Sequence, residues 1–304
     1  SNDGDGSADT LTGIENVIGS VGADDIAGDG GNNVLSGGTG NDILEGGAGD
    51  DTLDGGAGVD TADYSGDASA VNIDLATGTA TDGFGGTDTM ISIENVTGTA
   101  FDDVLIGTTA ANTLDGGAGN DTIQGRAGID VLIGGAGTDT ADYSAAAGGI
   151  VVDLGANAAT DDGDGASDTL TGIENIVGSG GADSITGDAG ANVLSGGASA
   201  DTLDGAGGND TINGGVGNDV ILASAGADTI DGGNDIDTLD YSGLAGINFI
   251  SVTLNGATNA TVTVDGGTDD TVRNVENVTG TAGNDTLVGD ANNNTLDGAG
   301  GNDT

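Results

Sequence analysis

The residues of this chain that could do chemistry are aspartates that recur every nine residues within glycine-rich turns. Residues 37–63 read GGTGNDILE, GGAGDDTLD and GGAGVDTAD, three copies of Gly-Gly-x-Gly-x-Asp-x-U-x in which U is usually apolar. Glycines adopt the left-handed conformations of tight turns and leave carbonyl oxygens uncovered. The position-six aspartate lies where turn becomes strand, so its carboxylate can reach back over those carbonyls. Because Ca²⁺ prefers such oxygen ligands, the sequence predicts calcium sites.

The candidate ligands belong to the unbroken runs of nine-residue copies. If copies n and n+2 lie on one side of the molecule, their carboxylates can share an ion between successive coils, giving up to about 12 Ca²⁺ ions. The candidate aspartates are Asp24, Asp42, Asp51, Asp60, Asp103, Asp121, Asp130, Asp139, Asp183, Asp201, Asp210, Asp219, Asp228, Asp237, Asp285 and Asp303. The candidate glycines are Gly37, Gly40, Gly46, Gly49, Gly116, Gly119, Gly214 and Gly217.

Some copies depart from the pattern, and their sites are expected to bind calcium more weakly. The second copy of every run has asparagine at position six, which offers an oxygen without a charge; these residues are Asn33, Asn112, Asn192 and Asn294. Asp42→Ala should therefore lower calcium affinity more than Asp51→Ala, because Asp51 is paired with Asn33. Turns that lack a glycine are also doubtful sites, and the replacements are Phe101, Ala110, Ser199 and the pair Ala223-Ser224.

The copies are organised in four rounds. Each round has a lone copy, a six-residue insert such as SIENVT, and a run of five, five or seven copies, with the fourth round incomplete. The third run is longer by two copies, or 18 residues. An insertion of this size favours a coil of two copies, one in each of two sheets. The predicted modules are residues 1–63, 64–142, 143–240 and 241–304.

The connectors between runs also resemble one another. Each opens with Tyr-Ser, at Tyr64, Tyr143 and Tyr241, and continues with alternating apolar residues that predict a half-buried strand entering a turn. The tyrosines are expected to cover an exposed end of each roll, in preference to forming a sugar-binding platform. The inserts carry glutamates that could either bind calcium or cap backbone N–H groups, and both interpretations stay open for Glu15, Glu94, Glu174 and Glu276.

Composition excludes several classes of function. The 304 residues carry 51 acidic and 2 basic side chains, for a net charge of -49, so nucleic acid is not expected as a partner. Anionic membranes would repel the chain, and no apolar run is long enough for membrane insertion. No signal-peptide pattern is visible at the start. Without His, Cys or Lys, and with many equivalent aspartates, the chain is not expected to be an enzyme.

The same composition, with 65 glycines and 2% aromatic residues, is typical of disordered segments. A disordered polymer has no reason to keep a nine-residue register, so the spacing favours a fold. One apolar side chain per copy is little to set against the entropy of ordering nine residues. We therefore expect a chain that is disordered without calcium and β-rich with it.

The GGxGxD copies and the ADYS…VxIDL…IENV connectors resemble the RTX (repeats-in-toxin) family over essentially the whole length. The resemblance implies an all-β fold, a right-handed parallel β-roll with calcium between its turns. It also implies a bacterial protein exported by type I secretion, unfolded in the calcium-poor cytosol and folded in an extracellular or cell-surface location. Because the chain stops inside a copy, it is expected to be a fragment of a larger protein.

Two functions compete. Repetition of whole modules favours a structural region of a large secreted surface protein, such as an adhesin stalk, surface-layer component or extracellular filament, with possible calcium-dependent self-association. The alternative is a calcium-dependent folding and secretion domain attached to an exported hydrolase or toxin. Ice binding would need a regular outward row of threonines, and third positions such as Val21, Gly30 and Ala48 form none.

Overall fold

The computed structural model describes residues 13–244, 246–265 and 269–304. Regular structure in these residues consists of β-strands, and none of it is a helix that could cross a lipid bilayer. The chain forms two compact units, one made of Ser1–Ala141 with Ser167–Ile173 and the other of Asp142–Ala166 with Glu174–Thr304. The lone copy expected at residues 4–12 lies outside the described residues.

Each complete copy of a run forms one strand around position eight, and in several copies the strand continues through the next Gly-Gly pair, as in β3 (Val34–Thr39). In β11 (Val104–Ile106) only the central residue, Leu105, is buried. This residue occupies position eight of its copy, and the same position supplies Leu35, Leu44 and Leu53 to the core. Within the first three runs, the hydrophobic core is therefore a stack of single aliphatic side chains, one from each copy.

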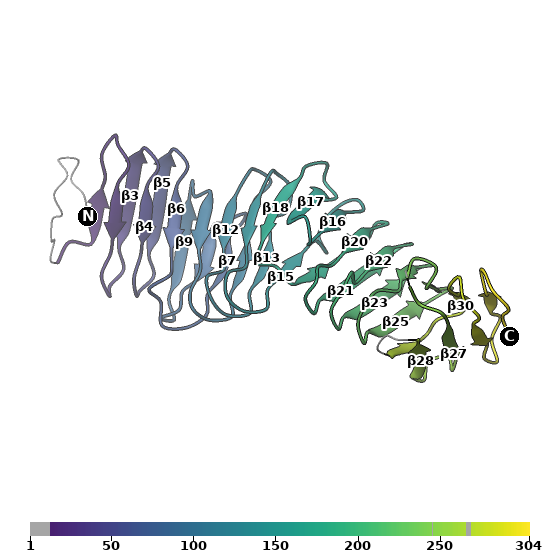
Figure 1. Cartoon of the computed structure of the whole chain (residues 1–304). Coiled ribbons are helices and arrows are strands. Elements are labelled where there is room, and N and C mark those ends of the chain that lie inside the picture. Colours follow the sequence, from purple (N-terminus) through teal and green to yellow (C-terminus); the bar gives the residue numbers. More distant parts are fainter. Residues whose placement is uncertain (1–12, 245, 266–268) are drawn as a thin grey trace. The chain divides into compact units, whose positions relative to one another are not determined.

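The strands of the first unit form two sheets (Figure 1). The first sheet runs in the order β1 (Asn16–Ile18), β3 (Val34–Thr39), β5 (Thr52–Ala57), β9 (Thr87–Ile91), β8 (Thr79–Thr81), β7 (Asn72–Asp74), β11, β13 (Thr122–Gln124) and β15 (Thr140–Asp142). The second runs β2 (Asp25–Ala27), β4 (Ile43–Glu45), β6 (Thr61–Asp63), β10 (Asn95–Thr97), β12 (Thr113–Asp115), β14 (Val131–Ile133) and β18 (Asp168–Thr171).

The second unit repeats this construction. One sheet runs β19 (Asn175–Val177), β21 (Val193–Ala198), β23 (Thr211–Val216), β25 (Thr229–Asn234), β29 (Asp270–Arg273), β28 (Ala260–Val264), β27 (Ile250–Thr253) and β31 (Thr286–Val288). The other runs β17 (Ala158–Asp161), β16 (Val151–Asp153), β20 (Ser184–Thr186), β22 (Thr202–Asp204), β24 (Val220–Leu222), β26 (Thr238–Asp240), β30 (Asn277–Thr279) and β32 (Thr295–Asp297).

Strand register confirms the predicted parallel β-roll with two copies per coil. Val34 of β3 pairs with Thr52 of β5, 18 residues later, and successive copies within a run alternate between the two sheets. Within the runs, the strands of copies n and n+2 are neighbours in one sheet and pair in parallel. Each coil therefore adds one strand to each sheet.

The lone copies and inserts are part of the stack, not breaks in it. The lone copy forms β9, which pairs in parallel with β5, and the insert forms β10, which lies between β6 and β12. The connector that precedes the lone copy, residues 64–82, supplies the predicted strand, β7, and also β8. Because β7, β8 and β9 pair in antiparallel order, the connector is a meander inserted into the sheet.

The sequence led us to expect that the connector tyrosines cover an exposed end of each roll. The structure instead places two of them inside the roll. Tyr64 is 2% exposed and Tyr241 is 0% exposed, so both lie inside the roll. The hydroxyl of Tyr64 donates to Asp88 Oδ2 at 3.0 Å, and that of Tyr241 donates to Asp270 Oδ2 at 2.8 Å. Each tyrosine is thus anchored to the position-six aspartate of the following lone copy.

Candidate metal centres

Position-six carboxylates form ladders along the stack of coils. Asp60 Oδ1 accepts the backbone N–H of Asp42 at 2.8 Å, and Asp42 Oδ1 accepts the N–H of Asp24 at 2.8 Å. The contact recurs at an interval of 18 residues; other acceptors are Asp51, Asp121, Asp130, Asp139, Asp201, Asp210, Asp219, Asp228, Asp237 and Asp303. One oxygen of each carboxylate therefore holds the preceding coil in register.

The second oxygen of many of these carboxylates is buried without a donor. Among the residues that the structure describes, no hydrogen bond reaches Oδ2 in a set that we call the open aspartates, namely Asp42, Asp51, Asp60, Asp121, Asp201, Asp210, Asp219 and Asp237. A buried carboxylate oxygen without a partner is costly, because water no longer solvates its charge. A bound cation would supply the missing partner.

The position-one glycine makes room beside each open oxygen. A methyl group added to Gly214 would lie 2.5 Å from Asp219 Oδ2 and against the carbonyl oxygen of Gly232 in the next coil. Gly37, Gly46 and Gly116 face the Oδ2 atoms of their own copies in the same way. Carboxylate and carbonyl oxygens thus face a shared space from which side chains are absent.

The position-four glycines serve the turn by allowing close stacking. Gly40, Gly49, Gly119 and Gly217 have φ between 127° and 141°, in the region that favours glycine. A methyl group on Gly40 would lie 2.5 Å from the carbonyl oxygen of Gly22, one coil earlier. Any larger residue would push the coils apart.

These donor sets fit calcium. Ca²⁺ takes several oxygen ligands and accepts carboxylates and backbone carbonyls together. The described ranges contain no group of three or more acidic side chains converging on one point, so carbonyl oxygens must complete each set. The ion would neutralise the buried carboxylates and join consecutive coils through them.

The residue at position two separates open aspartates from closed ones. In the open copies position two is left-handed, as at Gly38 with φ of 100°. In the first copy of each run position two is Ser or Thr, and its N–H donates to Oδ2: Ser20 to Asp24 at 2.5 Å and Ser179 to Asp183 at 2.7 Å, for example. The closed aspartates of this kind are Asp24, Asp103, Asp183 and Asp285, in which the hydroxyl of position two also bonds Oδ1.

Two further candidate aspartates, Asp228 and Asp303, differ from the open set. Asp228 Oδ2 accepts the hydroxyl of Ser224 at 3.0 Å, one of the residues expected to weaken a site. Ser199, another such residue, keeps the left-handed conformation of a position-four glycine with φ of 78°. Asp303 Oδ1 accepts the backbone N–H of Asp285, but the residue is exposed to solvent.

Three of the four asparagines at position six bond to the insert of their own round. Asn112 Nδ2 donates to the carbonyl oxygen of Glu94 at 2.7 Å, and Asn192 and Asn294 make the same bond to Glu174 and Glu276. An aspartate could not donate this bond. In these three runs asparagine suits position six of the second copy because the insert one coil earlier presents a backbone acceptor there. Asn33 Nδ2, in the first run, is buried without a hydrogen-bond partner among the described residues.

The insert glutamates take the place of a position-six aspartate. Glu94 Oε2 accepts the N–H of Asp60 at 2.9 Å, and Glu276 Oε2 accepts the N–H of Asp237 at 2.9 Å. The structure thus places Glu94 and Glu276 as caps of backbone N–H groups, one of the two roles that the sequence left open.

Sequence reasoning missed the aspartates of the lone copies. Asp88 and Asp270 continue the ladders, because their Oδ1 atoms accept the N–H groups of Asp51 and Asp228 at 2.9 Å and 3.0 Å. Both occupy position six of their copies, so the nine-residue spacing could have identified them. Their Oδ2 atoms are used by the connector tyrosines.

Burial raises the pKa of several of the open carboxylates. The pKa of Asp201 and of Asp237 is raised to about 7, mainly by burial and then by neighbouring acids. The same causes raise the pKa of Asp121 and Asp210 to about 6. A bound cation would reverse this effect by stabilising the ionised form.

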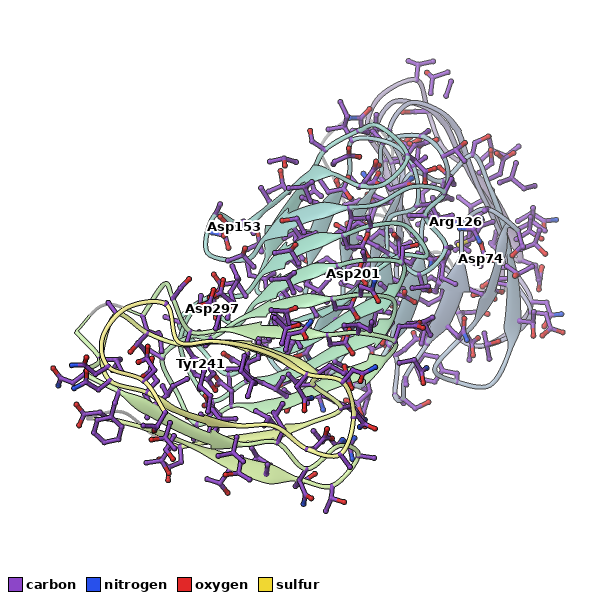
Figure 2. The ribbon with its side chains drawn as sticks, turned by 90° about the vertical axis from the view of Figure 1, so that its right-hand side faces the viewer. Asp74, Arg126, Asp153, Asp201, Tyr241 and Asp297 are labelled. Atoms are coloured by element: carbon purple, nitrogen blue, oxygen red, sulfur yellow. The ribbon has the colours of Figure 1, made fainter. Side chains whose placement is uncertain are left out.

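The two arginines offset little of the charge. Arg126 lies 3.7 Å from Asp74, and Arg273 lies 2.6 Å from Asp231 at the surface. Figure 2 shows the first of these pairs beside the strands of its unit, while Asp201 lies among the stacked strands of the other.

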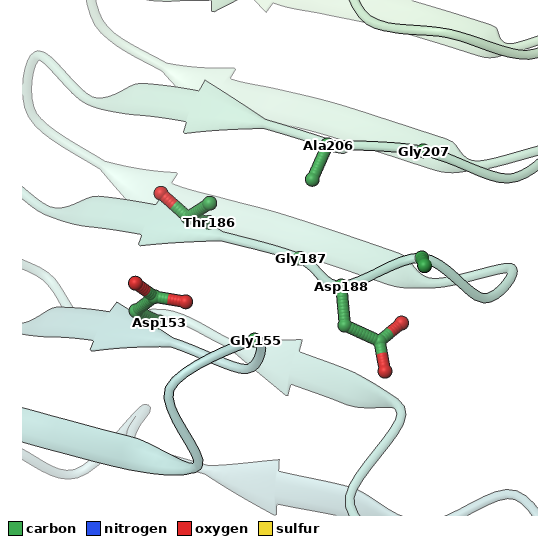
Figure 3. A pocket seen from close by; sticks show the side chains of 8 residues that line it. Asp153, Gly155, Thr186, Gly187, Asp188, Ala206 and Gly207 are labelled. Carbon is green, nitrogen blue, oxygen red and sulfur yellow. The ribbon is translucent and has the colours of Figure 1, made fainter.

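A groove of about 370 Å³ in the second unit offers no reactive group (Figure 3). Its lining consists of small residues and the side chains of Asp153, Asp188 and Thr186. Asp153 Oδ1 accepts a turn N–H from Ala156 at 3.0 Å, and Asp188 Oδ1 accepts one from Gly190 at 2.7 Å. Both acids thus stabilise their own turns.

One comparison with known proteins, that with family models, agrees with this geometry. The model of the RTX calcium-binding nonapeptide repeat (4 copies) matches residues 9–44, 27–62, 97–132, 115–145, 168–203, 177–212, 204–239 and 274–304. A search of curated protein sequences found no match. Among solved structures, the extracellular lipase LipA from Serratia marcescens matches with 17% identity and a TM-score of 0.23; the match covers 88% of this chain and 39% of the lipase.

Proposed function

Because the chain belongs to the family of RTX calcium-binding nonapeptide repeats, we propose that it is the calcium-folded structural region of a large secreted bacterial surface protein. In this role the chain is a spacer or scaffold, as in an adhesin stalk, a surface layer or an extracellular filament. Calcium outside the cell would convert it from a disordered polymer into a stack of coils.

The observation that carries the proposal is the repetition of open aspartates along the ladders. Asp42 and Asp60 present buried Oδ2 atoms in consecutive coils, as do Asp201 and Asp219. Every such pair joins two coils when an ion lies between them. Calcium would therefore be part of the structure, and the length of the folded stack would follow the number of ions bound.

The arrangement of modules supports a structural role over attachment to an enzyme. Lone copy, insert and run recur through the chain with the same hydrogen bonds, as at Asp60–Glu94 and Asp237–Glu276. Repetition of a unit extends length, and a domain that only assists secretion has no need of it. No His, Cys or Lys is present to act as a base or nucleophile.

Circular dichroism with and without calcium tests the proposal. We expect a disordered spectrum in chelator and a β-rich spectrum at about millimolar Ca²⁺, with equal ionic strength maintained by NaCl as the control. A β spectrum that does not change in chelator would contradict the proposal. The sequence of the complete gene would then distinguish a repetitive surface protein from an exported hydrolase or toxin.

A further inference from the structure

Asp82 has an unpartnered oxygen although it lies outside the nine-residue pattern of metal ligands. It follows β8 in the first connector and is 3% exposed. Its Oδ1 atom accepts the N–H groups of Phe84 at 2.9 Å and Gly86 at 2.6 Å, which fix the side chain. Its Oδ2 atom is buried and accepts no hydrogen bond from the part of the chain that the structure describes.

At position six of the lone copy beside Asp82, both carboxylate oxygens already accept hydrogen bonds. Asp88, at position six, accepts the N–H of Asp51 through Oδ1 and the hydroxyl of Tyr64 through Oδ2. Asp51, in the preceding coil, keeps an open Oδ2 atom. At this place the ladder therefore lacks the second carboxylate that a pair such as Asp42 and Asp60 provides.

Asp82 is placed to supply the missing oxygen. A methyl group on Gly86 would lie 2.7 Å from Asp82 Oδ2 and against the carbonyl oxygen of Gly49. Carboxylate and carbonyl thus face one space beside a glycine, as they do beside Gly214. Gly49 belongs to the turn that leads into Asp51, so Asp82 lies beside the copy that carries this open aspartate.

We propose that Asp82 is a calcium ligand, and that with Asp51 and the Gly49 carbonyl it forms a site at the junction between the first run and the first connector. This site rests on the proposed calcium binding of the whole chain. Tyr64 leaves this role to Asp82, because its hydroxyl bonds the Asp88 oxygen that would otherwise face the ion.

Comparison of the connectors supports the assignment. Asp162 holds the same place in the second connector: it is 0% exposed, its Oδ1 accepts the N–H groups of Asp164 and Ala166, and its Oδ2 accepts no hydrogen bond from any residue described. In the third connector the corresponding residue, six before Asp270, is the buried apolar Val264. We therefore assign this type of ligand to two connectors and exclude it from the third.

Counting bound ions tests the proposal. Native mass spectrometry at saturating Ca²⁺ should show one ion fewer in Asp82→Asn than in the parent chain, because the amide keeps the turn hydrogen bonds but cannot replace the anionic oxygen. Asp25→Asn removes an exposed carboxylate from the outside of β2 and should bind the parental number. An unchanged count in Asp82→Asn would overturn the proposal. If the parent chain binds no calcium, the proposed function fails instead.

A second measurement needs no variant at Asp82, in case Asp82→Asn does not fold. Crystals of the parent chain grown with Tb³⁺ in place of Ca²⁺ should show an anomalous peak within bonding distance of Asp82. Peaks at the open aspartates without one at Asp82 would refute the assignment and leave the proposed function intact. Absence of peaks at both would contradict the proposed function.

Discussion

At the scale of single residues, the partners of a carboxylate depend on the residue four positions before it. Where that residue is left-handed, as at Gly38, its N–H does not reach the carboxylate and Asp42 keeps an open oxygen. Where it is serine, as at Ser20, both oxygens of Asp24 accept hydrogen bonds from it. Two aspartates in identical register thus have different chemistry, one suited to a cation and one to a turn.

The pair Asp42 and Asp24 provides the first prediction. Asp42→Asn should lower calcium affinity at its site by at least about tenfold, since a charged ligand is lost. Asp24→Asn should leave the number of bound ions unchanged, because its oxygens are already hydrogen-bonded within the protein. Isothermal titration calorimetry on both variants measures the difference, and equal losses would refute the distinction between open and closed aspartates.

The raised carboxylate pKa values give a prediction about pH. Between the ordinary aspartate pKa of about 4 and the values of about 6 to 7 for Asp121, Asp201 and Asp237, the folded calcium-free chain holds more protons than the unfolded chain. Its stability is therefore greatest at low pH and falls as pH rises through this window. Calcium requires the ionised form, so its affinity rises over the same window.

Circular dichroism checks both trends. In chelator, the β signal should be larger at about pH 4.5 than at about pH 7.5. The calcium concentration at the folding midpoint should fall as pH rises from about 5.5 to about 7.5. A midpoint that does not depend on pH would show that these carboxylates are not the ligands.

At the scale of elements, the turn limits which residues a copy can use. Position two must be left-handed for an open site, and seven of the eight open aspartates have glycine there. Arg126 and Ala206 adopt the same conformation with φ of 68° and 64°. Residues with a Cβ atom pay about 1–2 kcal/mol for this backbone region, so these turns are strained relative to their neighbours.

Ala206→Gly should therefore stabilise the second unit. Relief of the strain exceeds the added entropy of a glycine in the unfolded chain, and we expect a net gain of about 0.5–1 kcal/mol in the free energy of unfolding. The matched control is Ala198→Gly, in β21, where the backbone is not left-handed and the change should destabilise. Urea titration at fixed calcium measures both, and a loss of stability in Ala206→Gly would contradict the argument.

Much of the fold could be predicted from the sequence, because one period determines strand, turn and register together. The 18-residue coil and the buried residues at position eight, such as Leu44, follow directly from the spacing. The connectors did not follow, because β8 has few apolar residues and pairs with strands on both sides. The role of Tyr64 depends on a contact with Asp88, 24 residues later, which no local pattern predicts.

The site was predicted less completely than the fold. Spacing identified the aspartates but could not separate open from closed ones, since that depends on the backbone conformation of position two. The expectation that Asp51 is the weaker partner considered only Asn33. The structure adds Asp88 and the nearby Asp82 on its other side.

At the scale of the whole molecule, charge dominates behaviour. Two arginines accompany 51 acidic side chains, so molecules repel one another until cations bind. Bound calcium removes part of that repulsion and can bridge exposed carboxylates of two molecules. Folding and association should therefore respond to the same ion.

Light scattering tests this last prediction. We expect monomers in chelator and larger particles at about millimolar Ca²⁺, with Mg²⁺ at the same concentration much less effective because it releases its water reluctantly. NaCl at equal ionic strength controls for screening. Monomers in every condition would exclude calcium-dependent self-association.

The ladder of position-six contacts also has a direction. The N–H of each aspartate is accepted by the carboxylate one coil further along the chain, from Asp24 to Asp42 and from Asp42 to Asp60. The first coil of a folded segment thus has carboxylate oxygens that no preceding N–H reaches, and its last coil has backbone N–H groups that no following carboxylate accepts. Its two faces are chemically unlike, so a growing roll would template new coils differently at each. A coil removed from the C-terminal side uncaps its predecessor, whereas one removed from the N-terminal side leaves every remaining N–H capped.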